Sequence, residues 1–280
     1  MIICCGEALI DMIPTTLDSK ETAFIPKIGG AILNTSICLG RLGANVGFLG
    51  AVSKDLFGEQ ILEELINSKV NTSFCLETSN NTTLAFAKIA NGTTTYSFFD
   101  ENSSNRTICL KDVVLDDSVV DTIYVGGISL MSEPNGTEIE NFIAKESSKK
   151  IVFYDPNVRP NFIEDRSLFI QRFEKILSQS DIIKISEEDL EWLYPNGSFE
   201  EIYKQWLNLS LSIIVLTKGS EGAIIKTKNY EVTSRGEKVE VVDTIGAGDI
   251  FNGALLYSLS KHKSFSKKDL INIDILKEVL

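Results

Sequence analysis

Histidine is almost absent from this chain of 280 residues, and its cysteines follow no pairing pattern. The single histidine, His262, stands beside Lys261 and Lys263 near the end of an expected helix, where it would help to satisfy the helix C-terminus. Histidine-based catalysis and a multi-histidine metal site are therefore excluded. The five cysteines show no C-x-x-C spacing and cannot all pair within one chain, so a reducing cytoplasm is the simpler location.

Positive charge and long apolar runs are also scarce. Lys and Arg number 27 against 39 Asp and Glu, a net charge of −12, which argues against a nucleic-acid or anionic-membrane partner. No run of 18 apolar residues occurs. The N-terminal stretch lacks a basic region and carries Glu7 and Asp11, so we interpret it as a first strand and not as a signal peptide. We expect a cytoplasmic protein whose anionic ligands need a local positive site.

Strand-like and helix-like segments alternate along most of the chain. This alternation predicts an α/β fold in one domain, residues 1–280, with a mostly parallel central sheet and helices on both faces. The expected strands are Ile2–Ile10, Val46–Val52, Thr122–Val125, Ile151–Tyr154, Asp181–Ile185 and Ile213–Leu216. The expected helices are Ile32–Leu42, Phe57–Ser68, Gly136–Ser147, Ser167–Ser178, Glu187–Tyr194 and Glu200–Leu209.

One interval, residues 82–99, departs from this alternation. Two strand-like runs flank Asn91-Gly92, which is a strong hairpin signal. We predict a small β lid beside the main domain, with a plain surface hairpin as the alternative. Exposed strand edges in such a lid favour a homodimer formed through it.

The segment Asp243-Thr244-Ile245-Gly246-Ala247-Gly248-Asp249 combines a flexible loop, a helix start and a carboxylate. Val239–Val242 has the character of a strand, and the residues from Ala247 onward have helical spacing. A phosphate could bind the exposed N–H groups at this helix start, and Asp249 could take a proton from an attacking hydroxyl. The alternative is that Asp249 only complements the helix dipole.

Three further loops follow predicted strands. Gly29-Gly30 and Asn34 suit the close approach and hydrogen bonding of a hydroxylated ligand, and Asp11 would add a carboxylate at the carboxyl edge of the sheet. Arg159, in Asp155–Pro160, could neutralise phosphate charge, and Thr217–Gly222 could contact a nucleotide. Taken singly, each could be an ordinary cap or turn.

With these motifs the chain resembles the ribokinase-like (PfkB) family of carbohydrate kinases, most closely its fructokinases. The resemblance runs from Ile2 to about Ser260. It rests on GGAILNTSICLGRLG at 29–43 and DTIGAGDIFNGALL at 243–256, and is supported by GEALIDMIP, TTLAFAKI, VGGISLMSEP and YDPNVRPNF. It implies a ribokinase-like three-layer sandwich and an ATP-dependent sugar kinase that uses Mg²⁺.

The resemblance also implies roles for individual residues. Asp249 would be the general base, Gly246, Ala247 and Gly248 the anion hole, and Arg159 a group near the phosphates. The sugar would be held by Asp11, Gly29, Gly30 and Asn34, and ATP by Thr217, Gly219, Gly222 and Lys184. Water-mediated Mg²⁺ contacts would fall to Glu188 and Asp189, in a Ser186–Asp189 segment that matches the family's Asn-x-x-Glu motif with Ser and Asp at its ends. A monovalent cation is a further candidate cofactor.

Two departures from the family pattern bear on function. Fructokinases usually place an Arg after an aromatic residue in the lid, where this chain has Phe98-Phe99-Asp100-Glu101, which counts against an acidic sugar. Family members also continue for roughly thirty residues past the last residue of this sequence, through a helix and a loop that wall off the adenine. The loop has an ordinary connection length. The resemblance therefore implies either a different tail at that wall or a site open on the adenine side.

Fructose phosphorylation is the predicted reaction. Kinases for another sugar or a nucleoside, such as 2-keto-3-deoxygluconate, ribose or adenosine, are the alternatives, because one framework serves many acceptors. A sugar-binding or regulatory protein without turnover is a further alternative. A nicotinamide-dependent dehydrogenase would need G-x-G-x-x-G after the first strand, and Cys5-Gly6-Glu7-Ala8 does not supply it.

Overall fold

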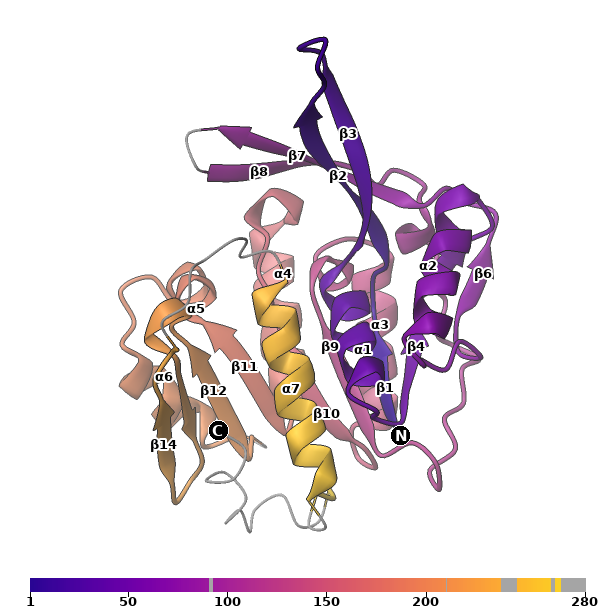
Figure 1. Ribbon diagram of the computed structural model, residues 1–280. Coiled ribbons are helices and arrows are strands. Elements are labelled where there is room, and N and C mark those ends of the chain that lie inside the picture. Colours follow the sequence, from indigo (N-terminus) through magenta and orange to yellow (C-terminus); the bar gives the residue numbers. More distant parts are fainter. Residues whose placement is uncertain (91–92, 210, 238–245, 263–264, 268–280) are drawn as a thin grey trace.

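A large sheet covered by helices on both faces forms the body of the protein, and a smaller sheet projects beside it (Figure 1). The computed structural model describes residues 1–90, 93–209, 211–237, 246–262 and 265–267. The predicted α/β fold with a mostly parallel central sheet is confirmed. Within the described ranges, no helix is long and apolar enough to cross a membrane.

The large sheet has eight strands in the order β14-β13-β12-β11-β10-β9-β1-β4. The run from β4 to β12 is parallel, and β13 and β14 continue it antiparallel. Strands buried on both faces are expected to be continuously apolar, as most of these are. Their bounds are β1 (Ile2–Cys5), β4 (Val46–Leu49), β9 (Thr122–Gly126), β10 (Ile151–Asp155), β11 (Ile182–Ser186), β12 (Ile213–Thr217), β13 (Ala223–Lys226) and β14 (Glu231–Ser234).

Helices cover the large sheet in two layers, and alternate residues of the strands pack against each. Ile2 and Cys4 of β1 contact the layer formed by α1, α2 and α7, whereas Ile3 and Cys5 contact the opposite one. Every helix expected from apolar spacing begins within one residue of its predicted start. The helices are α1 (Ala31–Arg41), α2 (Leu56–Asn67), α3 (Asn135–Glu146), α4 (Arg166–Gln179), α5 (Glu187–Leu193), α6 (Phe199–Trp206) and α7 (Ala247–Lys261).

Two predicted strands are each divided in the structure. The expected strand Ile2–Ile10 is wrong as a single element, because β1 ends at Cys5 and β2 (Leu9–Thr16) pairs in the smaller sheet. The expected strand Val46–Val52 is divided into β4 and β5 (Ala51–Ser53) at Gly50. A Cβ at Gly50 would lie 2.2 Å from the Gly6 carbonyl oxygen, so the chain turns where two backbones meet closely.

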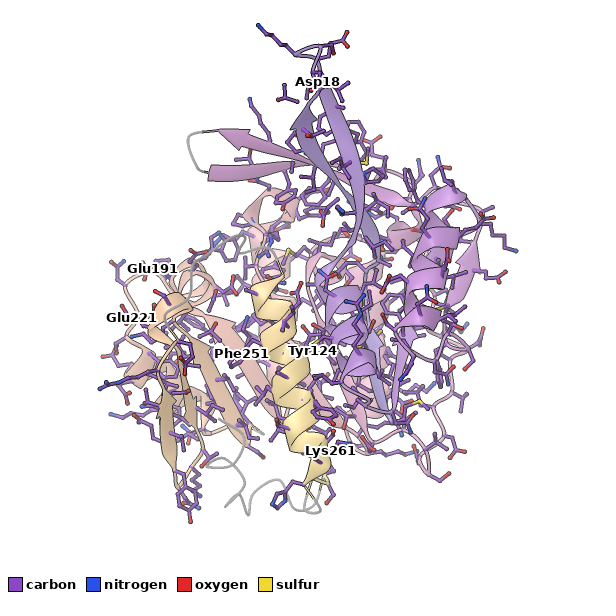
Figure 2. All side chains as sticks on the ribbon, viewed as in Figure 1. Asp18, Tyr124, Glu191, Glu221, Phe251 and Lys261 are labelled. Atoms are coloured by element: carbon purple, nitrogen blue, oxygen red, sulfur yellow. The ribbon has the colours of Figure 1, made fainter. Side chains whose placement is uncertain are left out.

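The smaller sheet, which we call the lid, has the order β3-β2-β7-β8. The predicted antiparallel pair at 82–99 is confirmed as β7 (Thr83–Ala90) and β8 (Thr93–Phe99), while its turn residues Asn91 and Gly92 lie outside the described residues. Half of the lid was missed, since β2 and β3 (Thr22–Gly29) complete it. Asp18 marks the far end of the β2–β3 arm (Figure 2).

Short elements connect these layers. β5 pairs with β6 (Leu76–Thr78), and single 3-10 turns occur at η1 (Ser104–Arg106), η2 (Ile128–Leu130), η3 (Pro160–Phe162) and η4 (Gly219–Glu221). The expected strand Val239–Val242 and the residues Asp243–Ile245 lie outside the described part of the chain. All five cysteines are described, and all are free thiols.

Candidate active site

A cavity of about 650 Å³ lies between the lid and the carboxyl ends of the parallel strands. On the lid side it is bordered by β2 and β8, and on the other side by the residues that follow β1, β9, β10 and β11 and by the first turns of α1 and α7. From β1 the chain passes to β4 on one side and later to β9 on the other side of β1. The direction of the strand order therefore reverses here, which makes this a switch point of the sheet. Ligands of open α/β sheets bind at such points.

The first turn of α7 faces this cavity without a capping side chain. Its N-cap is Gly246, whose φ of 75° is left-handed and therefore suits glycine. Gly246 and Gly248 both line the cavity, and a Cβ at Gly248 would lie 3.6 Å from the Lys184 Nζ. Open N–H groups with an ammonium beside them form a site suited to an anion. Ala247, the first residue of the helix, is exposed but does not border the cavity.

Asp249 lies in that turn and is 8% exposed. Its Oδ2 accepts a hydrogen bond of 2.9 Å from Asn34 Nδ2, and its carbonyl oxygen accepts one of 3.2 Å from Thr35 Oγ1, so two residues of α1 hold it. Burial raises the pKa of Asp249 to about 6, helped by the Asp155 and Glu7 carboxylates and opposed by Asn34 and Lys184. A carboxylate with such a pKa is suited to general-base catalysis near neutral pH.

A buried polar network lies beneath Asp249. Asp155 Oδ2 accepts from Lys184 Nζ at 3.1 Å and from Asn252 Nδ2 at 2.7 Å, and Asn252 also donates to the Tyr124 hydroxyl at 2.9 Å. Tyr124 lies behind α7 in Figure 2. Lys184 is therefore fixed beside the first turn of α7 by a partner on β10. Sequence reasoning assigned no role to Asp155 or Asn252, although both stand inside the motifs that carried the resemblance.

Asp11 lines the cavity from a different element than expected. It was predicted at the end of the first strand of the central sheet, but it lies within β2 of the lid. Burial raises the pKa of Asp11 to about 6. Gly29 makes room for this carboxylate, because a Cβ there would lie 2.1 Å from Asp11 Oδ2, and Gly30 borders the cavity directly. Asp11, Gly30 and Asn34 thus all line the one cavity.

Aromatic side chains of β8 also border the cavity. Tyr96 and Phe98 line the cavity, and Phe98 packs edge-on against Phe162 of η3 with ring centroids 4.2 Å apart. Asp100, in the segment where an Arg was expected from the resemblance, is buried at the base of the lid. It accepts hydrogen bonds from Thr83, Ser103 and Arg106, so it anchors the lid strands.

The residues predicted to bind ATP and metal are divided between the cavity and its surroundings. Arg159, Lys184 and Glu188 line the cavity. Thr217 ends β12, and Gly219 and Gly222 border η4, but none of the three lines the cavity as far as the structure describes its walls.

Asp189, the other predicted metal contact, is held away from the cavity. It is buried, and its Oδ1 accepts the Val158 N–H at 3.0 Å. Among the described residues, no group of three Asp, Glu, His or Cys side chains could hold a metal ion by itself.

Glu7 is a further carboxylate of the site, and no role was predicted for it from the sequence. It lines the cavity, is 1% exposed, and accepts hydrogen bonds from the Ala31 N–H and from the Ser129 N–H and hydroxyl. Burial raises the pKa of Glu7, and the hydrogen bonds oppose that rise. A glutamate inside an apolar strand-like run was the available signal, because an unpaired buried charge is costly.

Comparison with known proteins identifies the family. Residues 1–268 match the model described as pfkB family carbohydrate kinase. A fructokinase of Rhizobium leguminosarum bv. trifolii is 40% identical over 274 residues, which are 98% of this chain and 84% of that protein.

Two solved structures share the fold. The fructokinase of Xylella fastidiosa with bound ATP is 25% identical with a TM-score of 0.88, covering 97% of this chain and 84% of that one. An aminoimidazole riboside kinase of Salmonella enterica is 21% identical with a TM-score of 0.81, covering 97% of this chain and 88% of that one. The chain therefore belongs to the pfkB family of carbohydrate kinases.

Proposed function

We propose that this sugar kinase is an ATP-dependent fructokinase. The observation that carries the proposal is the contact between Asn34 and Asp249 at the uncapped start of α7, where a sugar-facing amide meets a carboxylate beside an anion site. The Rhizobium relative named as a fructokinase supports fructose as the acceptor.

The reaction requires a base, an attacking hydroxyl and charge neutralisation, because phosphoryl transfer is catalysed mainly by positioning and electrostatics. Asp249 would take the proton of the fructose hydroxyl while the hydroxyl oxygen forms a bond to the γ-phosphorus of ATP. The bond between that phosphorus and the ADP oxygen breaks at the same centre. The N–H groups of Gly246, Ala247 and Gly248, with Lys184 and Arg159, would stabilise the charge on the transferred group.

Mg²⁺ fits the phosphate end of this cavity. Glu188 borders the cavity and offers a carboxylate, whereas Asp189 Oδ1 is engaged by the Val158 N–H, so a water-mediated contact falls more naturally to Glu188. When bound, Mg²⁺ would offset the negative charge of the phosphates. The monovalent cation remains a prediction.

The part of the cavity that the lid lines favours a neutral acceptor. The described lid residues that line the cavity are Leu9, Asp11, Thr95, Tyr96 and Phe98, and none of them is basic. A carboxylate and an amide can accept and donate hydrogen bonds to adjacent hydroxyls, while aromatic rings cover the carbon face of a sugar. An anionic sugar such as 2-keto-3-deoxygluconate would meet Asp11 without a compensating cation from the lid.

A coupled ADP-release assay with Mg·ATP tests the proposal. Fructose, glucose, ribose, adenosine and 2-keto-3-deoxygluconate are compared as acceptors, with Asp249→Asn as the blank. Fructose-dependent release that disappears in the blank is expected. Turnover with a different acceptor would make the protein a kinase for that sugar or nucleoside. Sugar binding without any ADP release would indicate a sugar-binding protein that lacks turnover.

We also propose a homodimer through the outer face of the lid. Phe24, Phe86 and Phe99 form a row across three lid strands, with centroid separations of 4.9 and 5.2 Å. Phe99 is 64% exposed and follows Phe98, which faces the cavity, so the row lies on the opposite face. Multi-angle light scattering should give a mass of two chains, and one chain after Phe99→Asp. A wild-type monomer would contradict this.

A further inference from the structure

The carboxylate of Glu7 joins three elements around the cavity. Its Oε1 accepts the Ala31 N–H at 3.0 Å and the Ile32 N–H at 3.5 Å, and its Oε2 accepts the Ser129 hydroxyl at 2.7 Å and the Ser129 N–H at 3.3 Å. Glu7 itself follows β1, Ala31 begins α1, and Ser129 belongs to η2 after β9. One buried side chain therefore connects β1, α1 and the end of β9.

Two glycines leave room for Glu7, Gly30 beside its backbone and Gly127 beside its carboxylate. Gly30, the N-cap of α1, has φ 106° and provides no capping side chain, and a Cβ there would lie 3.1 Å from the Glu7 carbonyl oxygen. A Cβ at Gly127, where φ is 66°, would lie 2.3 Å from Glu7 Oε1. Glu7 thus does from a distance what an N-cap side chain normally does, which is to satisfy the first N–H groups of the helix.

Glu7 also lies where the lid joins the body of the protein. The chain leaves β1 through Gly6, Glu7 and Ala8 to enter β2, and it returns from β3 through Gly30 to begin α1. The hydrogen bond from Ala31 to Glu7 ties these outgoing and incoming connections together. Asp11 lies four residues beyond Glu7 in β2, and Asn34 lies in the first turn of α1.

We infer that Glu7 is a positioning residue for phosphoryl transfer: by joining the two connections of the lid to the start of α1, it holds Asn34 against Asp249 and Asp11 at the same cavity. This inference rests on the proposed function and deepens it. Glu7 accomplishes this through the backbone of α1, since its own carboxylate is occupied by protein donors. Without this carboxylate the start of α1 is no longer held, and Asn34, which orients Asp249, is then held less firmly.

The charge of Glu7 gives the inference a distinctive readout. Asp249 is surrounded by Glu7 from the β1–β2 connection, Tyr124 from β9, Asp155 from β10 and Lys184 from β11, while Asp11, Arg159 and Glu188 line the same cavity. Glu7 is one of the carboxylates that raise the pKa of Asp249. Removing its negative charge should therefore lower that pKa, and the acid limb of the kcat/KM profile should move to lower pH.

The test compares Glu7→Gln with Glu138→Gln. Glu138 is a matched control, since its Oε2 accepts the Leu110 N–H at 2.9 Å and it does not line the cavity. In Glu7→Gln a single acceptor oxygen remains for the N–H groups of Ala31 and Ser129. We expect the variant to lower kcat/KM for fructose about tenfold, with KM for ATP changed less than about twofold. The acid limb should move to lower pH in Glu7→Gln alone. Unchanged fructose kinetics and an unchanged limb in Glu7→Gln would overturn the inference.

A second variant separates the hydrogen bond from the charge and covers a failure of Glu7→Gln to fold. Ala31→Pro removes the N–H that Glu7 accepts at the first helical position, where proline is tolerated, and it leaves the carboxylate in place. We expect kcat/KM for fructose to fall, while the acid limb of its pH profile stays at the wild-type position. Wild-type fructose kinetics in Ala31→Pro would contradict positioning through α1.

Failure of the proposed function is recognised separately. A wild-type protein that releases no ADP with any acceptor would refute the kinase proposal. Calorimetry of fructose binding would then test the role of Glu7. The Glu7→Gln variant should bind fructose more weakly than the Glu138→Gln variant. Equal fructose affinity in those two variants would overturn the inference about Glu7.

Discussion

The starts of α1 and α7 share a glycine of positive φ at the N-cap but differ in their electrostatic surroundings. Each helix begins at a glycine of positive φ without a capping side chain of its own, and both first turns border the cavity. At α1 a buried carboxylate, Glu7, satisfies the N–H groups, whereas at α7 the Lys184 ammonium lies beside Gly248. The charge placed against each helix start therefore decides its chemistry: a carboxylate already occupies the N–H groups of α1, whereas the open N–H groups of α7 beside an ammonium suit an anion.

Helices away from the cavity show a third arrangement. α2 and α4 begin at Asp55 and Asp165, each of which accepts two N–H groups of its own first turn. These caps are local in sequence, as the usual N-cap is. Among these four helices, only α1 and α7, the two that start at the cavity, lack a capping side chain at the N-cap.

Replacing the carboxylate on α7 should have the largest effect. Asp249→Asn keeps an oxygen that can accept from Asn34 but cannot take a proton, so kcat should fall about 10³-fold while fructose affinity stays within a few fold. Steady-state ADP release and calorimetric fructose binding measure the two quantities. Turnover retained within about tenfold of wild type would remove Asp249 as the base.

Removing the cation beside α7 should have the next largest effect. Lys184→Met should lower kcat/KM for ATP about 10²-fold, because charge on the transferred group loses its nearest ammonium, and KM for fructose should change little. Lys175→Met, on the exposed side of α4, is the matched control. Because Lys184→Met leaves Asp155 unpaired, the double variant with Asp155→Asn separates a loss of stability from a loss of catalysis. Equal losses for ATP and fructose would contradict a role at the phosphate end.

The pH dependence should report the burial of the base. Asp249 must be ionised to accept a proton, and its pKa is raised from 3.8 to about 6. Below that pKa, kcat/KM should fall about tenfold per pH unit, and in Lys184→Met the limb should move to higher pH because a cation that lowers the pKa is gone. A pH profile of initial rates checks both. An acid limb that stays near the ordinary value of a carboxyl would show that Asp249 does not limit the rate.

The smallest effect should come from an ordinary cap. Asp165→Ala removes the acceptor of the Ser167 and Leu168 N–H groups at the start of α4. The free energy of unfolding should fall by about 1 kcal/mol, as measured by urea denaturation, with kcat and both KM values unchanged. A kinetic defect in Asp165→Ala would weaken the distinction between ordinary caps and the two helix starts at the cavity.

The elements that sequence predicted well share a strong local signal. Helices such as α1 and α4 are periodic over three turns or more, and the strands β9 to β12 are short apolar runs buried on both faces. Gly246, Gly248 and Asp249 are adjacent in the chain, so their common location follows from the helix start itself. The division of Ile2–Ile10 was missed because Leu9 and Ile10, which begin β2, are as apolar as β1, and the two strands differ in the partners with which they pair.

Local sequence patterns were enough to predict the fold class, the helices, the paired strands of the lid hairpin and part of the cavity lining, including Gly246, Gly248 and Asp249. They were enough because periodicity, turn residues and a phosphate-type helix start act within a few residues of one another. Three features follow from tertiary contacts alone: Asp11 lies in the lid, Asn34 contacts Asp249, and Glu7 and Lys184 lie against two different helix starts. Those contacts join residues that are far apart in the chain, and their energies depend on burial and on neighbouring charges that no local pattern records.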